Sequence, residues 1–135
     1  MAESRNAKGA PPPMGTYSNA AWERRDGRLL FIAGQVGVGE DYKPTGSGDI
    51  ESQTEQTLRN IQTIVEDAGG SMDDIVSMTV YVTDIAHAGA VNQVRDTFFE
   101  PGYPSSALVQ VSALMHPSLL VEISAVASIA PSAAS

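Results

Sequence analysis

The chain has 135 residues, of which 42% are hydrophobic and 18% charged, an ordinary composition for a globular domain. Its net charge of −8 argues against a nucleic-acid-binding surface, and the lack of cysteine excludes disulfides, thiolate nucleophiles and cysteine-based zinc sites. With only two histidines, we expect no metal site. No apolar run approaches the roughly 20 residues of a membrane span, so we expect a cytoplasmic protein with neither a membrane partner nor a nucleic-acid partner.

The N-terminal third predicts a tail, a hairpin and a loop. Residues 1–13 are small and polar and end in three prolines, which predicts a flexible tail. Tyr17–Glu23 and Arg28–Val36 predict two strands of a β-hairpin, because the turn Arg25-Asp26-Gly27 between them contains an Asp-Gly pair. Gly37–Gly48 holds four glycines and a proline and predicts a long loop.

A long helix is predicted over Asp49–Gly69. Asp49 can serve as its N-cap, and Gly69-Gly70 marks its end. Apolar residues recur at helical spacing, which predicts one face packed on a core. These residues are Leu58, Ile61, Val65 and Ala68.

The remainder of the chain alternates strands with one more helix. We expect a strand over Asp74–Thr83, a helix from the cap Asp84 through Phe99, and strands over Ser105–Leu114 and Leu119–Ile129. The order β-β-α-β-α-β-β indicates an α+β sandwich with two helices on one face of a mixed sheet. A single domain would span residues 14–130, and residues 131–135 would form a second flexible tail.

The second face of this sheet is too apolar for water and too polar for a helix-packed core. In the predicted strand Arg28–Val36, Leu30 and Ile32 alternate with Leu29 and Phe31, so both faces carry large apolar groups. Two helices cover only one face of a sheet. We therefore expect the second face to meet other subunits of an oligomer; the alternative is a solvated face with a few stray apolar residues.

Glu122 is the only charged residue after Glu100, and it lies within the otherwise uncharged segment Leu119–Ser128. A carboxylate in such a strand needs hydrogen-bond partners, a neutral form or a polar pocket. A general acid or base requires the same conditions, so Glu122 is the first candidate for a catalytic residue.

Six segments, in order, resemble the reactive-intermediate deaminase family (Rid, or YjgF-type). They are Met14–Ala20, Phe31–Val36, Gly48–Gln53, Asp74–Asp84, Ala90–Phe99 and Val121–Ala127. The resemblance implies a chorismate-mutase-like fold and a homotrimer with three clefts between subunits. It also implies hydrolysis of enamines and imines to carbonyl compounds and ammonia, without a metal or an organic cofactor.

The resemblance also implies site residues. Glu122 would orient or deprotonate the attacking water, and the Tyr17 hydroxyl would close the cleft or orient the substrate. The predicted substrate-binding positions are Ala33, Gly34, Gln35, Asn92, Ser106, Ala107, Leu108 and His116. For Asn92 the alternative is a structural role in capping backbone groups, and for His116 it is an exposed turn.

Two positions depart from the family pattern. Ala33 stands where a serine is usual, and Ser106 stands where an arginine usually grips a substrate carboxylate through two charged hydrogen bonds. No Lys or Arg follows Arg95, so no neighbour in the sequence replaces that arginine. The loss of this arginine would reduce the free energy of binding a substrate carboxylate by about 1.5–3 kcal/mol. Good hydrolysis of amino-acid-derived imines is therefore not expected.

Two hypotheses follow for function. The first is a metal-free hydrolytic deaminase of a small enamine or imine, such as an aminomuconate-type catabolic intermediate, with Arg24, Arg25 or His116 as anion contacts. The alternative is a non-catalytic ligand-binding or regulatory trimer that has lost deaminase activity, which Ala33 and Ser106 favour. RNA cleavage would require basic grooves, for which this acidic chain offers no support.

Overall fold

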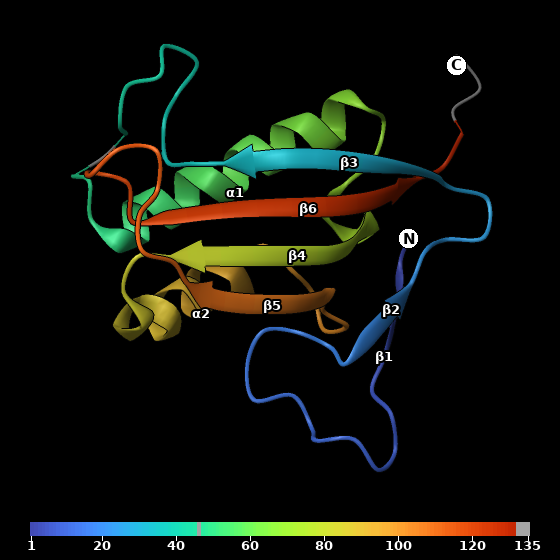
Figure 1. The fold of residues 1–135 in the computed structure, drawn as a ribbon. Coiled ribbons are helices and arrows are strands. Elements are labelled where there is room, and N and C mark those ends of the chain that lie inside the picture. The colour runs from blue at the N-terminus through green and yellow to red at the C-terminus, as the bar shows by residue number, and fades with distance from the viewer. Residues whose placement is uncertain (46, 132–135) are drawn as a thin grey trace.

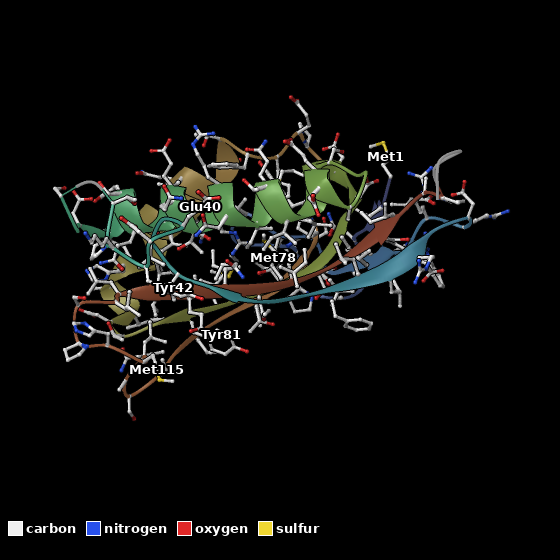
Figure 2. All side chains as sticks on the ribbon, turned by 90° about the horizontal axis from the view of Figure 1, so that it is seen from above. Met1, Glu40, Tyr42, Met78, Tyr81 and Met115 are labelled. Atoms are coloured by element: carbon white, nitrogen blue, oxygen red, sulfur yellow. The ribbon has the colours of Figure 1, made fainter. Side chains whose placement is uncertain are left out.

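The main sheet has four strands, and both helices lie on the same face of it (Figures 1 and 2). The computed structural model describes residues 1–45 and 47–131. The strands lie in the order β3, β6, β4 and β5, where β6 is antiparallel to both neighbours and β4 and β5 are parallel. Their bounds are β3 Arg28–Gln35, β4 Ile75–Val82, β5 Ser105–Gln110 and β6 Val121–Ile129. The predicted α+β sandwich is confirmed.

The longer helix, α1 (Ile50–Asp67), begins and ends as its sequence predicts. Asp49 is the N-cap, and its carboxylate accepts a hydrogen bond of 2.7 Å from the Ser52 backbone N–H. Gly69 lies in the left-handed region at φ +93° just after the helix, where a glycine is favoured. The apolar stripe of α1 packs on the sheet, and Leu58, Ile61 and Val65 are fully buried.

The second helix is shorter than predicted. Asp84 does act as a cap, but it caps a short 3-10 turn, Ile85–His87, and accepts a hydrogen bond from the Ala86 backbone N–H. The α-helix that follows, α2, covers Ala88–Asp96. In Figure 1 it lies behind β4 and β5, beside α1.

The predicted hairpin is wrong, because its first strand pairs with the N-terminus. Strand β2 (Ala20–Trp22) is antiparallel to β1 (Glu3–Arg5), while β3 pairs with β6. The Asp-Gly turn does form, with the Gly27 backbone N–H donating to the Arg24 carbonyl at 3.2 Å. A turn motif specifies that the chain reverses, but it does not specify which strand each arm pairs with.

The prediction of a flexible tail over residues 1–13 is wrong for its first part. Besides forming β1, the N-terminus is anchored near the start of β4: the Ala2 backbone N–H donates to the Asp73 carbonyl. The terminal ammonium lies 3.6 Å from the Asp74 carboxylate, which Arg24 also contacts at 3.3 Å. Composition alone did not reveal these long-range partners. Of the predicted C-terminal tail, residues 132–135 lie outside the described residues.

The core lies between the helices and one face of the sheet. Alternate residues of β6 point into it, and Val121, Ile123 and Ala127 are almost or fully inaccessible. In β4 the pairing with β6 shifts between Ile75 and Ser77, so Ile75 is buried where simple alternation predicted Val76.

The other face of the sheet, here called the open face, carries exposed apolar side chains. Phe31 is 75% exposed, Leu29 is 52% exposed and Val109 is 42% exposed. Ile32, which alternates with Phe31 along β3, is buried on the side of the helices. Within the described residues, no helix is both long and apolar enough to cross a membrane.

The buried stripe of α1 gives a stability prediction. Leu58→Ala should lower the free energy of unfolding by about 2–5 kcal/mol, because it removes buried methyl groups and leaves a cavity. Leu58→Met nearly conserves the volume and should cost less than about 1.5 kcal/mol. Urea unfolding followed by circular dichroism measures both, and equal losses would contradict the tight packing of this position.

Candidate functional site

Glu122 lies on the open face, at the start of β6. Its neighbours Val121 and Ile123 point into the core, so the alternation of the strand turns Glu122 the other way. The segment Leu119–Ser128 is therefore buried on one face only, and the carboxylate is half-buried in the single chain. The charge of Glu122 therefore does not have to be accommodated inside the core.

The Glu122 side chain lies against the backbone of Gly34. The pairing of β3 with β6 shifts between Ile32 and Gln35, which places Gly34 in an irregular stretch of β3. A Cβ atom at Gly34 would lie 2.3 Å from Glu122 Oε2 and 2.8 Å from its Cδ. Only glycine leaves room for the carboxylate there. Gln35 Nε2 donates to the Ala33 carbonyl at 3.2 Å and so closes this short stretch on itself.

The Glu122 carboxylate has no protein hydrogen-bond partner among residues 1–45 and 47–131. Both of its oxygens can therefore accept hydrogen bonds from water or from a bound molecule. Within the same ranges, no group of three or more His, Asp or Glu side chains is placed to hold a metal ion.

Tyr81 is a neighbour of Glu122 that sequence reasoning missed as a site residue. It lies directly across from Glu122 in the β4–β6 pairing, and Val109 of β5 lies next to it on the other side. The sequence predicts a strand over Asp74–Thr83, but the pairing of β4 with β6, which brings Tyr81 to Glu122, could not be deduced from the sequence pattern.

The loop between β5 and β6 carries His116 and borders the end of the sheet near Glu122. Figure 2 shows Met115 and Tyr81 on the side of the sheet that faces away from the helices. His116 is exposed, and its Nδ1 lies 2.7 Å from the Ser118 hydroxyl. Buried Gln53 holds this loop: its amide donates to the Ser118 carbonyl and accepts from the Leu120 backbone N–H, both at 2.8 Å.

Tyr17 and Asn92 lie together, but not near Glu122. The Thr16 hydroxyl donates to the Asn92 carbonyl at 3.2 Å, and a Cβ atom at Gly15 would lie 3.2 Å from Asn92 Nδ2. Tyr17 Oη accepts a hydrogen bond from the Met14 backbone N–H at 3.1 Å. These contacts attach the segment Met14–Ser18 to α2.

This segment also reaches the start of β5, which fixes its place relative to Glu122. The Ser18 backbone N–H donates to the Pro104 carbonyl, and Ser18 forms a bridge with Ser105. Glu122 lies beside Tyr81 of β4, and Tyr81 lies beside Val109 of β5. Val109 is four residues further along β5 than Ser105. The offset is roughly 13 Å along the strands and roughly 14 Å across three strand spacings. One chain therefore separates Glu122 from Tyr17 by roughly 19 Å.

Of the three predicted positions on β5, only Ala107 lies on the open face, beside Thr79 of β4. Ser106 and Leu108 pair with Met78 and Val80, which are buried core residues. Their side chains therefore point toward the helices, and the Ser106 hydroxyl is buried without a hydrogen-bond partner among the described residues. Ser106 does not share a surface with Glu122.

Arg24, one of the predicted anion contacts, lies elsewhere too. Arg24 is paired with Asp26 at 2.8 Å and with Asp74 just before β4 begins, at the end of β4 opposite to Tyr81. The hydrogen bond that Arg24 donates to Asp26, together with the negative charge of Asp26, raises the pKa of the Arg24 guanidinium. In a single chain, Arg24 serves the anchored N-terminus and cannot reach Glu122.

Comparison with known proteins now identifies the family. The family described as endoribonuclease L-PSP matches residues 7–129. A RutC family protein of Pyrococcus horikoshii is 39% identical over 118 residues, which cover 87% of this chain and 90% of that protein. A crystal structure of a Rid family protein of unknown function from Yersinia pestis is similar with a TM-score of 0.86 and 30% identity, covering 95% of this chain and 98% of that chain. This chain belongs to the Rid family.

One Rid relative has a name that states an activity. The mouse protein named 2-iminobutanoate/2-iminopropanoate deaminase is 34% identical over 118 residues, which cover 87% of this chain and 84% of that protein. The family that the six sequence segments resembled is thus confirmed, and the fold of the Yersinia pestis structure agrees with the two helices on a mixed sheet.

The contact between Gly34 and Glu122 gives a testable prediction for this Rid protein. Gly34→Ala should push the carboxylate away from the strand, because the new Cβ atom would overlap it. The side-chain end of Glu122 can rotate, so the free energy of unfolding should change by less than about 1 kcal/mol. The 13C chemical shift of the Glu122 carboxyl should change clearly in the variant.

Gly89→Ala is the matched control, because a Cβ atom at Gly89 meets no atom within 4 Å. It should leave the Glu122 carboxyl signal where it is in the unmodified protein. A Glu122 signal that is the same in Gly34→Ala and in Gly89→Ala would contradict the close contact between Gly34 and Glu122.

Proposed function

We propose that this protein is a hydrolytic deaminase of a small imine or enamine, in which Glu122 activates water. One observation carries the proposal: a half-buried carboxylate lies against Gly34 on the open face, and neither of its oxygens has a hydrogen-bond partner among residues 1–45 and 47–131. A general base needs such an unoccupied acceptor oxygen within reach of water. The activity in the name of the mouse relative supports the choice of reaction.

The reaction needs only one group that takes up and returns a proton. Glu122 accepts a proton from water while the water oxygen attacks the carbon of the C=N bond, and it returns this proton to the nitrogen to give a carbinolamine. Glu122 then takes the hydroxyl proton and passes it to the amino nitrogen as the C–N bond breaks, which gives a carbonyl compound and ammonia. An enamine enters the same sequence after protonation at carbon. Overall, one imine and one water molecule give one carbonyl compound and one ammonia molecule.

We further propose that the working unit is a homotrimer. Tyr17 lies roughly 19 Å from Glu122 in one chain, which is far longer than a small imine. A second copy packed on the open face would bring one copy's Tyr17 segment toward the other copy's Glu122. The exposed side chains of Phe31, Leu29 and Val109 on that face support such packing.

The non-catalytic alternative keeps the same cleft without the reaction. The departures at Ala33 and Ser106 favour it, since each removes a polar group that the family pattern provides. The family description of an endoribonuclease has no support in the charge of this chain, because RNA binding depends on basic surfaces and the net charge is −8.

The catalytic role of Glu122 predicts a large loss in Glu122→Gln. The amide keeps the shape but cannot accept the proton, so the rate of ammonia release should fall about 100-fold or more. Imines generated in situ by an amino-acid oxidase serve as substrates, and ammonia is measured against a reaction without the protein. Glu66→Gln, at an exposed position of α1, is the control and should keep the full rate.

Two outcomes decide between the hypotheses. Undiminished ammonia release by Glu122→Gln would contradict the proposed mechanism. If the unmodified protein releases no ammonia above background yet binds a keto acid, the non-catalytic alternative is correct.

The proposed trimer is tested by mass and by one substitution on the open face. Light scattering coupled to size exclusion should give about three times the chain mass of 14.2 kDa. Phe31→Glu puts a charge on the apolar open face and should yield monomers. Thr63→Glu adds the same charge on exposed α1 and should leave the trimer intact. A monomeric unmodified protein would refute the proposal.

A further inference from the structure

Arg95 is a fully buried cation that has no acidic partner among the residues that the structure describes. The side chain extends from α2 and is 2% exposed. Its Nη2 donates a hydrogen bond of 2.6 Å to the Thr16 carbonyl, and its Nε is buried without a partner in the described part of the chain. None of the ion pairs between residues 1–45 and 47–131 includes Arg95.

This arrangement is unusual for a guanidinium. Burying a charge costs free energy unless another charge or several hydrogen bonds compensate it, and buried arginines are therefore usually paired. Burial lowers the pKa of Arg95 to about 10, so the group still carries its charge at neutral pH. The chain has 16 acidic residues, yet at this place it offers the guanidinium only a neutral backbone carbonyl.

Arg95 belongs to the half of the candidate site that contains Tyr17 and Asn92. Thr16, which accepts its hydrogen bond, also binds the Asn92 carbonyl through its hydroxyl. Two residues later the same segment pairs with the start of β5, where Ser106 has a buried hydroxyl without a partner. The segment Met14–Ser18 thus covers Arg95 and carries Tyr17.

We propose that Arg95 binds the carboxylate of the substrate. The carboxylate would replace the Thr16 carbonyl on the guanidinium and accept two parallel hydrogen bonds, from Nε and Nη2. The turn Met14–Tyr17 would move aside to admit it, and the Ser106 hydroxyl is a further donor at this corner. This inference rests on the proposed function and specifies its substrate class as small imines that carry a carboxylate.

The exchange of acceptors favours binding. A carboxylate carries the opposite charge and can accept two parallel hydrogen bonds from a guanidinium, whereas the neutral Thr16 carbonyl accepts one. The first half of the turn that has to move is free, since Met14 is 94% exposed and Gly15 is exposed, whereas Thr16 is only 7% exposed and is the residue that the carboxylate has to displace. The substrate carboxylate would also provide the negative charge that the protein does not place beside Arg95.

This inference changes the interpretation of Ser106. The sequence shows that no neighbour in the chain replaces the arginine missing at Ser106. The fold brings Arg95 to the same corner from α2, through the contacts of Thr16 and Ser18. A carboxylate-binding arginine can therefore be present although the expected position on β5 lacks it.

Binding of 2-oxobutanoate tests the inference without requiring turnover. This keto acid carries the carboxylate of an imino acid and is stable in water. Calorimetry should show that it binds the unmodified protein, whereas 2-butanone, which lacks the carboxylate, should bind at least about 10-fold more weakly. Arg95→Lys keeps the charge but loses the two parallel N–H donors of the guanidinium, and it should raise the Kd of 2-oxobutanoate by about 10–100-fold. Arg28→Lys, at an exposed position of β3, is the control and should leave the Kd unchanged.

A measurement on the unmodified protein covers the case in which Arg95→Lys fails to fold. The Nε–H resonance of Arg95 should shift in 15N spectra as 2-oxobutanoate is added, and amide exchange at Gly15–Tyr17 should change with it. No binding of the keto acid, an unchanged Kd in folded Arg95→Lys, or binding without a shift of the Arg95 resonance would each overturn the proposal. If binding follows these expectations while no ammonia is released, the proposed reaction fails and the Arg95 site stands.

Discussion

The position of β6 between β3 and β4 determines which side chains enter the core and which side chains form the candidate site on the open face. Because both edges of β6 are paired, its alternating side chains have only two destinations, the helix-covered core and the open face. Val121 and Ile123 enter the core, so Glu122 between them has to lie on the open face. The same pairing brings Gly34 and Tyr81 to either side of the carboxylate. The packing of the core and the position of the candidate catalytic group Glu122 thus both depend on the register of β6 with its two neighbouring strands.

Local sequence signals predicted the elements whose physics is local. The helix α1 follows from an N-cap at Asp49, a 3.6-residue apolar period and glycines after its end, and all three are present in the structure. The pairing of β1 with β2 depends on residues 15 or more positions apart, and nothing in the composition of residues 1–13 indicated it. The Asp-Gly turn was recognised correctly, and the partner of each arm was not.

The residues of the candidate site also fall into two groups, those that local sequence signals reveal and those that only long-range contacts reveal. Glu122 could be found because a lone charge in an apolar strand is visible in the sequence, and Gly34 because it lies in a segment that resembles the family. Tyr81 and Arg95 were missed because their relevance arises from contacts between distant segments. Arg95 in particular looks like an ordinary helix arginine in the sequence. Only the fold shows that Thr16 covers it and that no acid accompanies it.

The two halves of the site impose a condition on any reaction at Glu122. A small imine has reacting atoms only a few bonds from its carboxylate, whereas Glu122 and the segment over Arg95 lie roughly 19 Å apart in one chain. A single copy can therefore offer a base or an anion-binding group to such a molecule, but not both. The proposed association through the open face would let the two meet, since that face carries Glu122 and the exposed apolar side chains together. If Arg95 and Glu122 serve one substrate, the assembly is part of the catalytic machinery, and loss of the apolar contacts at Phe31 removes activity without altering either group.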